Sequence, residues 1–370
     1  MALAGCGGPD DGSVEFAEGA KAYEVRDFVR AERGFSESLK LAPENVDAIL
    51  MLARTELELG KIDAAREALQ RAQELAGGDC DVLLLSAQAA FHARDYETAR
   101  KLFLQVAEDG ELSASLRAEG WAGLGVVAMS DINTSTSLSA RDVARTAFLR
   151  AIKLDGRNAS ARYHLGVLYM NAFGYNEAAL DQFEIFVRLE KEADKRVQDV
   201  QHKTIPSVRE VIAASAARRD GVSKRDSAAS AAALKKAEEA WKKGTFKTAK
   251  LRYAEAFEAD VLSFPAAQGL ALAWLKTDTS KAGLREAAKY YRIASSLRPS
   301  SKETALAAGD LAYRLGNYVS AVAAYSHAVA ASPYDITAVD GLIRGLQKSG
   351  NQTSAKVYQK YREWIPVRKR

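Results

Sequence analysis

Residues 316–333 read GNYVSAVAAYSHAVAASP, eighteen residues with little chemistry beyond two tyrosines and one histidine. Ala321, Tyr325 and Ala328 are spaced four and then three residues apart, which places them on one face of a helix. Pro333 cannot donate a backbone hydrogen bond and disfavours helix in the residue before it. The stretch therefore predicts one short helix that buries a narrow face of mostly small side chains and ends near the proline.

The same spacing recurs along the chain, and from Ala31 to Ala65 to Ala99 the step is 34 residues each time. A second helical stripe precedes each triad, with a small residue where the two antiparallel helices cross, so we expect Gly309 to face Ala321. Neither helix can bury its face alone, so the pairs must stack. The other triads are Ala31, Phe35 and Ser38; Ala65, Leu69 and Ala72; Ala99, Phe103 and Val106; Ala144, Phe148 and Ala151; Ala249, Tyr253 and Ala256; and Ala287, Tyr291 and Ala294.

This pattern resembles the tetratricopeptide repeat (TPR), a helix–turn–helix unit with a period of 34 residues. The resemblance implies an all-α fold, an α-solenoid of TPR-like repeats that winds into a right-handed superhelix. Two departures are a polar insertion at 130–142 and a shift of one residue near Gly174. The units are expected at about 12–45, 46–79, 80–113, 118–158, 159–189, 230–263, 264–300, 302–335 and 336–366.

The repeat pattern stops between the fifth and sixth units. Residues 192–219 predict one or two helices, broken near Pro206, that cap the units before them. Residues 220–229 contain Gly221, Ser223 and Ser227, which predicts a linker.

The charge also changes sign along the chain. Residues 1–200 carry 23 Lys/Arg and 33 Asp/Glu, a net charge of −10, whereas residues 201–370 carry 29 and 15, a net charge of +14. We therefore expect two blocks with different surfaces. The first, at 12–219, holds about five repeats plus capping helices, and the second, at 230–370, holds about four.

The first residues, MALAGCGG, contain Leu3-Ala4-Gly5-Cys6, which matches the bacterial lipobox at all four positions. In that family the cysteine is lipidated after cleavage, so the resemblance implies lipidation of Cys6 and a flexible tether within 1–11. Gly7 after the cysteine implies sorting to the outer membrane, with the solenoid facing the periplasm. Only five residues precede Cys6, too few for a signal peptide, and a chance match in a cytoplasmic protein is the alternative.

The sequence carries no motif for catalysis, a cofactor or a metal. Its four histidines, His92, His164, His202 and His327, are far apart, and HExxH, CxxC, GxxxxGK[ST] and GxSxG are all missing. Cys80 is expected to behave as a small apolar residue. We therefore predict no enzyme activity and no cofactor, and only clusters assembled from distant repeats stay open.

The resemblance to TPR proteins places the binding surface on the concave side, which the first helix of each unit lines. In the first block this lining is largely apolar and suits an amphipathic helix or an extended peptide. In the second it is basic with aromatic residues, which favours an acidic partner. Alternatively, the apolar residues of this lining pack within the repeat array, and its charged residues are ordinary solvated surface residues. The expected groove residues are Leu50, Leu84, Phe91, Val126, Met129, Tyr163, Val167, Met170, Trp241, Lys242, Lys276, Tyr313, Arg314, Arg344 and Lys348.

These features predict a non-enzymatic protein-interaction scaffold that holds a peptide or helix of a partner in its groove. The lipobox adds a membrane anchor, so the chain resembles bacterial TPR-containing lipoproteins of envelope assembly or secretion. The alternative is binding of nucleic acid or another polyanion through the basic block. An enzyme accessory subunit is a third reading that no pattern favours. Chaperone-binding TPR proteins hold C-terminal tails with a carboxylate clamp of lysine and asparagine at set inner positions. Those positions here are occupied by Phe16, Ala20, Leu50 and Arg54, so the clamp is missing.

Overall fold

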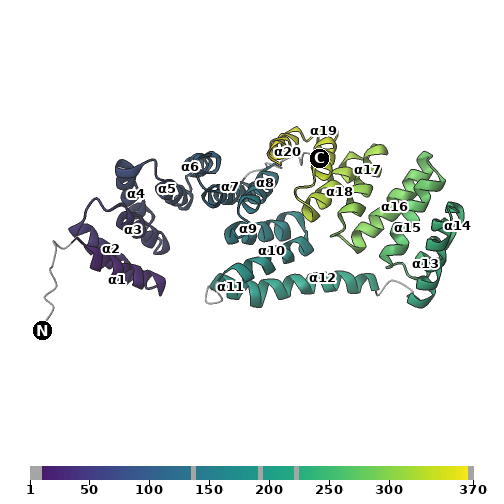
Figure 1. Cartoon of the computed structure of the whole chain (residues 1–370), viewed down its shortest axis with the longest axis horizontal. Coiled ribbons are helices and arrows are strands. Elements are labelled where there is room, and N and C mark those ends of the chain that lie inside the picture. Colours follow the sequence, from purple (N-terminus) through teal and green to yellow (C-terminus); the bar gives the residue numbers. More distant parts are fainter. Residues whose placement is uncertain (1–10, 135–138, 191–194, 221–224, 366–370) are drawn as a thin grey trace. The chain divides into compact units, whose positions relative to one another are not determined.

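The computed structural model describes residues 11–134, 139–190, 195–220 and 225–365, and leaves the side chains of 133–134 and 216–220 undescribed. Within these ranges the regular structure consists of helices and one isolated β-bridge between Arg225 and Asp260 (Figure 1). The predicted all-α fold is confirmed. No helix in the same ranges combines the length and the apolar character needed to cross a bilayer.

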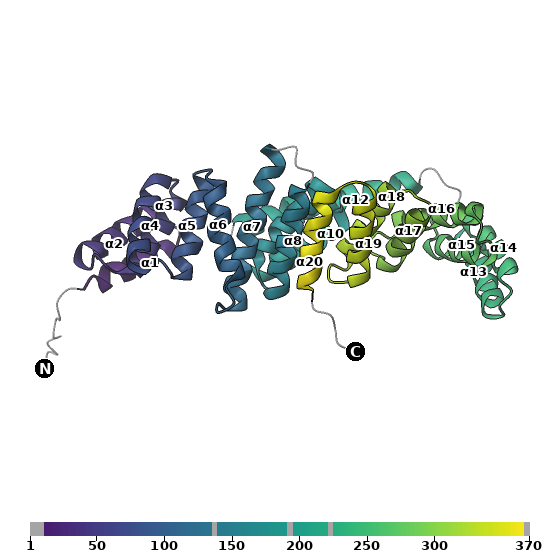
Figure 2. The ribbon, with the colours of Figure 1, turned by 90° about the horizontal axis from the view of Figure 1, so that it is seen from above.

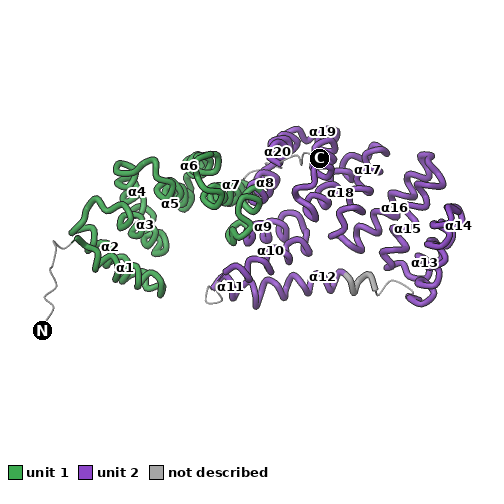
Figure 3. The backbone as a smooth tube through the Cα atoms, in the orientation of Figure 1, with its two compact units in different colours: residues 1–135, 150–161 green, residues 136–149, 162–370 purple. Residues whose placement is uncertain are grey.

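The chain divides into two compact units (Figure 3). Unit 1 comprises residues 1–135 and 150–161, and unit 2 comprises residues 136–149 and 162–370. The helices of unit 1 are α1 (Ser13–Glu24), α2 (Phe28–Leu41), α3 (Val46–Glu58), α4 (Ile62–Ala76), α5 (Cys80–His92), α6 (Tyr96–Glu108) and α7 (Ala114–Thr134). Two helices contribute residues to both units, α8 (Ala140–Leu154) and α9 (Ala159–Leu168).

The rest of unit 2 begins with two irregular helical stretches and continues as regular helix pairs (Figure 2). The first part contains the π-helix η1 (Tyr169–Phe173), α10 (Asn176–Leu189), α11 (Lys195–Asp199), the π-helix η2 (Val200–Thr204) and α12 (Ile205–Asp220). The pairs are α13 (Ser227–Lys242) with α14 (Phe246–Ala259), α15 (Phe264–Thr277) with α16 (Lys281–Leu297), α17 (Lys302–Arg314) with α18 (Tyr318–Ala331), and α19 (Ile336–Lys348) with α20 (Gln352–Trp364).

The triads with four-then-three spacing form the buried seams of both units. None of their residues is more than 8% exposed, and Ala321 is 0% exposed. The sequence predicted that Gly309 faces Ala321, but in the structure Gly309 faces the ring of Tyr325. A Cβ added at Gly309 would sit 2.7 Å from that ring. Gly341 of the next repeat faces the same ring at 2.5 Å. The ring of Tyr325 therefore fixes the spacing of α17 and α19.

The turns between paired helices show why the repeat length is constant. Gly60 adopts φ 74°, a left-handed conformation that glycine reaches without strain. Arg26 and Arg94 stand 34 residues before and after it, and both adopt φ 62°. In the quoted stretch, Asn317 caps α18 by accepting a hydrogen bond from the Ser320 backbone N–H at 3.1 Å.

The irregular stretches have physical explanations in π turns. A π turn holds one extra residue, and η1 ends just before Gly174, so η1 explains the shift of one residue in the fifth unit. The second π turn, η2, comes just before Pro206, where the sequence predicted a break. The polar insertion at 130–142 is partly helical because α7 runs to Thr134, and its residues 135–138 lie outside the described ranges.

The two compact units do not coincide with the expected blocks at 12–219 and 230–370. The expected linker, 220–229, lies within unit 2, and its residues 221–224 lie outside the described ranges. Within the expected linker, the Asp226 backbone N–H donates to the Ala259 carbonyl at 2.9 Å. The division falls instead at α8, whose first part bonds to the last repeats.

A buried polar network joins α8 to α18 and α20, and α20 lies beside α8 in both views (Figures 1 and 2). Asp142 accepts hydrogen bonds from the hydroxyls of Ser354 and Tyr358, each at 2.8 Å. Arg145 is fully buried and donates through Nη1 to Ser326 Oγ at 3.0 Å and through Nε to Tyr358 Oη at 2.7 Å. These bonds join residues about two hundred positions apart.

We expect Ala321→Leu to lower the free energy of unfolding by about 1–3 kcal/mol, because the added atoms have no space in the seam. Ala323→Leu is the matched control, since Ala323 is exposed on the same helix. Urea unfolding followed by circular dichroism measures both. Equal stability of the two variants would contradict the packing described for α18.

We expect Tyr358→Phe to cost about 1–3 kcal/mol of unfolding free energy, because Asp142 and Arg145 each lose a buried hydrogen-bond partner. Arg145→Met leaves the Asp142 carboxylate without its cation and should cost about 3–5 kcal/mol. Thermal melts compare these variants with Tyr313→Phe, a half-buried tyrosine of α17. A melting temperature of Tyr358→Phe equal to that of the control would show that the network contributes nothing to the fold.

Candidate functional site

The expected groove residues of unit 1 lie on its first helices, α3, α5 and α7. These helices contact one another directly, α3 with α5 and α5 with α7, so they form one continuous surface. Leu84 is only 5% exposed and therefore belongs to the core. The other four are half-buried: Leu50, Phe91, Val126 and Met129.

The apolar groove residues expected at the fifth repeat lie in unit 2. Val167 is on α9, Met170 is on η1, and both are half-buried. The ring of Tyr163 packs 5.3 Å from the ring of buried Phe186, so much of its surface serves internal packing. This part of the expected groove is only partly available to a ligand.

Aromatic residues and cations of the expected groove form two similar clusters in unit 2. In the first, the rings of Trp241 and Phe246 lie 4.9 Å apart, and Lys276 Nζ is 5.8 Å from the Phe246 ring centre. In the second, the rings of Tyr313 and Tyr318 are 5.3 Å apart, and Arg344 lies 5.9 Å from the ring of Tyr313. Each cluster joins two successive first helices through the second helix between them, so these side chains also hold the repeats together.

Four cations occupy one equivalent position in successive repeats of unit 2, the last turn of the first helix. All four are exposed, and no carboxylate in the described part of the chain lies within ion-pairing distance of any of them. The same position in unit 1 carries Glu24, Glu58 and His92, which are exposed as well. We call the four the cation row: Lys242, Lys276, Arg314 and Lys348.

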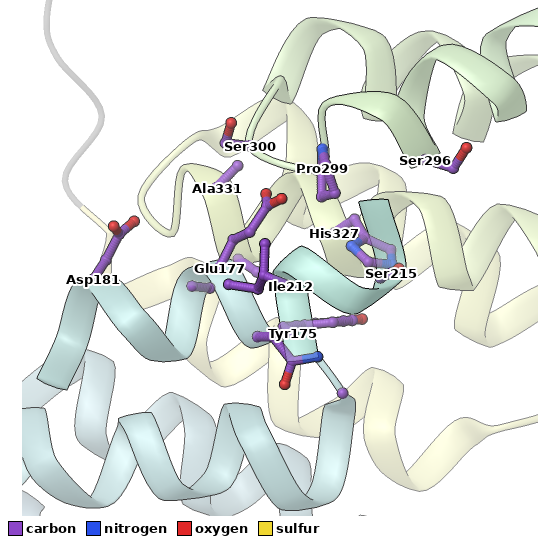
Figure 4. A pocket seen from close by; sticks show the side chains of 14 residues that line it. Tyr175, Glu177, Asp181, Ile212, Ser215, Ser296, Pro299, Ser300, His327 and Ala331 are labelled. Carbon is purple, nitrogen blue, oxygen red and sulfur yellow. The ribbon is translucent and has the colours of Figure 1, made fainter. Parts of the chain in front are cut away.

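Two adjoining cavities lie on another face of unit 2, along the second helices. The first, of about 600 Å³, runs between α16 and α18 over Ala308 and Ala312 of α17. We call it the α16–α18 groove. The second, of about 400 Å³, lies between the start of α10, α12 and the ends of α16 and α18, and we call it the Tyr175 pocket (Figure 4). Both are lined by His327, whose ring is 4.3 Å from that of Tyr175.

Two candidates for catalysis or metal binding among the described residues have structural explanations. Burial lowers the pKa of His164 to about 4, so this imidazole is neutral and stacks on Phe148 at 5.9 Å. In the described part of the chain, only Asp79, Cys80 and Asp81 bring three possible metal ligands together. Asp79 caps α5 with its carboxylate, and burial raises the pKa of the Cys80 thiol. Capping therefore explains this cluster without a metal.

The sequence did not reveal the two cavities, although one signal was present. Arg285, Lys289 and Arg292 follow the helical spacing of four and three on the exposed side of α16. Which helix lies opposite that stripe depends on the tertiary structure. Cys6 and the rest of the lipobox lie outside the described residues, so the lipobox stays a prediction.

Comparison with known proteins agrees with the helix pairs. A family model described as "Tetratricopeptide repeat" matches residues 22–81, and a second with the same description matches residues 280–336. No curated protein matches the chain.

Several solved structures are similar in part. A MamA protein is 21% identical over 49% of this chain and 92% of its own, with a TM-score of 0.35. A MamA fragment from Desulfovibrio magneticus RS-1 is 15% identical over 50% of this chain and 98% of its own, with a TM-score of 0.37. The Cut9–Hcn1 assembly of the APC/C matches 96% of this chain and 79% of its own at 12% identity and a TM-score of 0.35. At these TM-scores the likenesses support no inference about partners.

The family matches fall on α1 to α5 and on α16 to α19, in separate parts of the chain. Between them, α13 to α16 repeat the same buried triads and the same paired helices. The chain is therefore a tetratricopeptide-repeat protein.

Proposed function

We propose that this protein is a non-enzymatic scaffold whose unit 2 binds an acidic segment of a partner protein across its first helices. The cation row is the observation that carries the proposal. Its four positive charges recur once per repeat, are exposed, and have no carboxylate partner among the described residues. An acidic helix or extended segment laid across the repeats would meet a positive charge at each of them.

The aromatic clusters support the same surface. Trp241 and Tyr313 are half-buried and lie one residue before Lys242 and Arg314. A partner would therefore meet apolar ring surface beside each of these charges, which suits an amphipathic acidic segment.

A membrane anchor at Cys6 is the second part of the proposal. It rests on Leu3-Ala4-Gly5-Cys6 alone, and it would hold the scaffold at a bacterial outer membrane, facing the periplasm. An acyl chain contributes about 0.8 kcal/mol per buried CH₂, so several chains on one cysteine anchor firmly. A scaffold in that place would serve envelope assembly or secretion.

Nucleic acid is the competing ligand for the cation row. Phosphates would also pair with four exposed cations beside aromatic rings, and such binding weakens steeply with salt. A protein partner and a nucleic acid are distinguished by what crosslinks to the row.

We expect a photoreactive amino acid at Arg314 or Lys348 to form adducts with a partner protein in native cells, because both positions face the proposed ligand. Arg252, on the second helix α14 with its side chain 42% exposed, is the matched control position and should give none. Charge reversal by Lys276→Glu should then weaken binding of the identified partner about three- to tenfold. Adducts removed by nuclease would establish the nucleic-acid alternative, and equal adducts from Arg252 would refute the proposal.

We expect the chain, expressed behind a bacterial lipoprotein signal sequence, to incorporate labelled palmitate and to partition into detergent. Cys6→Ser should lose both properties, and Cys80→Ser should keep them, since Cys80 lies in α5. Labelling that persists in Cys6→Ser, or is missing from the wild type, refutes the anchor. It leaves the scaffold proposal unaffected.

A further inference from the structure

We infer that the α16–α18 groove is a second binding surface, for an amphipathic helix of a partner protein that carries acidic residues along one edge and small residues beside them. The groove lies along second helices, and no residue of the cation row lines it. The inference therefore does not rest on the proposed function. It rests on the charge of one wall, the uncharged facing wall and the small side chains between them.

The α16 wall of the groove is positively charged. Arg285, Lys289 and Arg292 are spaced four and then three residues apart on the exposed side of α16, and no carboxylate is among the described side chains that line the groove. Arg285 and Arg292 form no ion pair with a described residue. Glu286 lies outside the lining at 3.9 Å from Lys289, and such an exposed pair contributes little. Three positive charges therefore stand along about 10 Å of this wall.

The facing wall, α18, is uncharged. Its sequence is YVSAVAAYSHAVAA, which contains no Asp, Glu, Lys or Arg. Ser320 and Ala323 line the groove and are exposed, and the adjacent Val319 is 75% exposed. The buried seam explains the small residues Ala321 and Ala328 but not these exposed ones. A partner could bury apolar side chains against this wall without removing a charge from water.

The groove has the form that a helix fills. Both α16 and α18 pack on α17, which lies between them and supplies the floor (Figure 1). Ala308 and Ala312 of that floor are four residues apart, and Ser320, Ala324 and His327 of the wall are four and three apart, so each helix offers one stripe along its axis. Small side chains in these stripes allow the close approach at which helices pack.

A helix also matches the spacing of the cations. Its positions i, i+4 and i+7 lie on one edge and advance about 10 Å, as Arg285, Lys289 and Arg292 do on α16. An extended segment would leave its backbone groups unpaired in the groove, because the backbone groups of the helical walls are already bonded within those helices. From Arg285 to Ser295 the wall advances about 15 Å, which corresponds to about three turns of a bound helix.

Other polyanions fit the groove less well. A nucleic acid would pair with the cations but would gain nothing from the uncharged α18 wall, and a bilayer is too flat to reach a floor recessed between two helices. The α18 wall is also held in place, because Ser326 accepts a hydrogen bond from the buried Arg145. A preformed site loses less entropy on binding.

The test is a selection against the full-length protein from a phage library that displays randomised helix faces on a stable three-helix scaffold. Helices that lose binding to Arg314→Glu/Lys348→Glu occupy the cation row and are set aside. We expect the helices that remain to carry Asp or Glu at positions i, i+4 and i+7, with Ala, Gly or Ser beside them. The groove variant, Arg285→Glu/Arg292→Glu, should bind them at least tenfold more weakly than wild type.

The matched charge control is Lys247→Glu/Lys356→Glu, which reverses two exposed charges on the second helices α14 and α20 and should bind within twofold of wild type. Selected helices whose acidic residues are replaced by lysine should bind the groove variant at least threefold more tightly than the original helices do. This exchange of charge shows that the groove variant is folded.

A steric variant examines the α18 wall. Ala323→Trp should weaken binding at least tenfold, because the indole would occupy the groove. Leu251→Trp is its control, since Leu251 stands at the same repeat position on α14 and is 63% exposed, and it should bind as wild type does.

The inference is overturned if no helix remains after the cation-row binders are set aside, or if the remaining helices lack an acidic edge. Undiminished binding to the groove variant or to Ala323→Trp refutes it as well, as does failure of the lysine helices to recover binding. A single-stranded oligonucleotide that displaces the selected helices and binds more tightly than they do would assign the cations of α16 to nucleic acid instead.

Discussion

The contact between an aromatic ring and a glycine is the constraint on which this structure depends. The ring of Tyr325 lies between Gly309 and Gly341, and any side chain at either glycine would overlap it. The same contact recurs where Phe35 meets Gly19, Phe103 meets Gly123, Phe183 meets Gly166 and Tyr253 meets Gly269. Close approach of the helix backbones follows, because a flat ring fills the space that two side chains would otherwise need. This contact constrains only a few positions in each repeat, so the residues on the exposed faces can vary without disturbing the fold.

The Arg145 network acts at longer range and selects which helices meet. A buried ion pair adds little net stability, because desolvation opposes the attraction between its charges. A wrong neighbour beside Arg145 would, however, leave a buried cation unpaired, which is far more costly. The bonds to Ser326 and Tyr358 therefore favour one arrangement of α8 with α18 and α20 over competing ones. They also hold the α18 wall of both cavities.

The repeat seams could be predicted from sequence, whereas the contacts between distant repeats could not. Ala321, Tyr325 and Ala328 are buried as their spacing requires, since a helical period depends only on local geometry. Asp142 and Arg145 look like ordinary charges of an amphipathic helix, and nothing near them in sequence indicates that Tyr358 covers them. The compact units differ from the expected blocks for this reason. Leu84 is buried on α5, which contacts α3, α4, α6 and α7, and this crowding is not visible in the position of Leu84 within its repeat.

The sign of the charge at the cation-row position is not explained by helix stability. The C-terminal end of a helix carries partial negative charge, so a cation in the last turn contributes about 0.3–1 kcal/mol and an anion opposes the helix. If stability decided this position, every repeat would carry Lys or Arg. Glu24 and Glu58 stand there in unit 1, where they work against the helix dipole, while unit 2 carries four cations. Helix stability alone therefore does not set the charge at this position, and the difference between the two units is what the proposed binding surface on unit 2 would require.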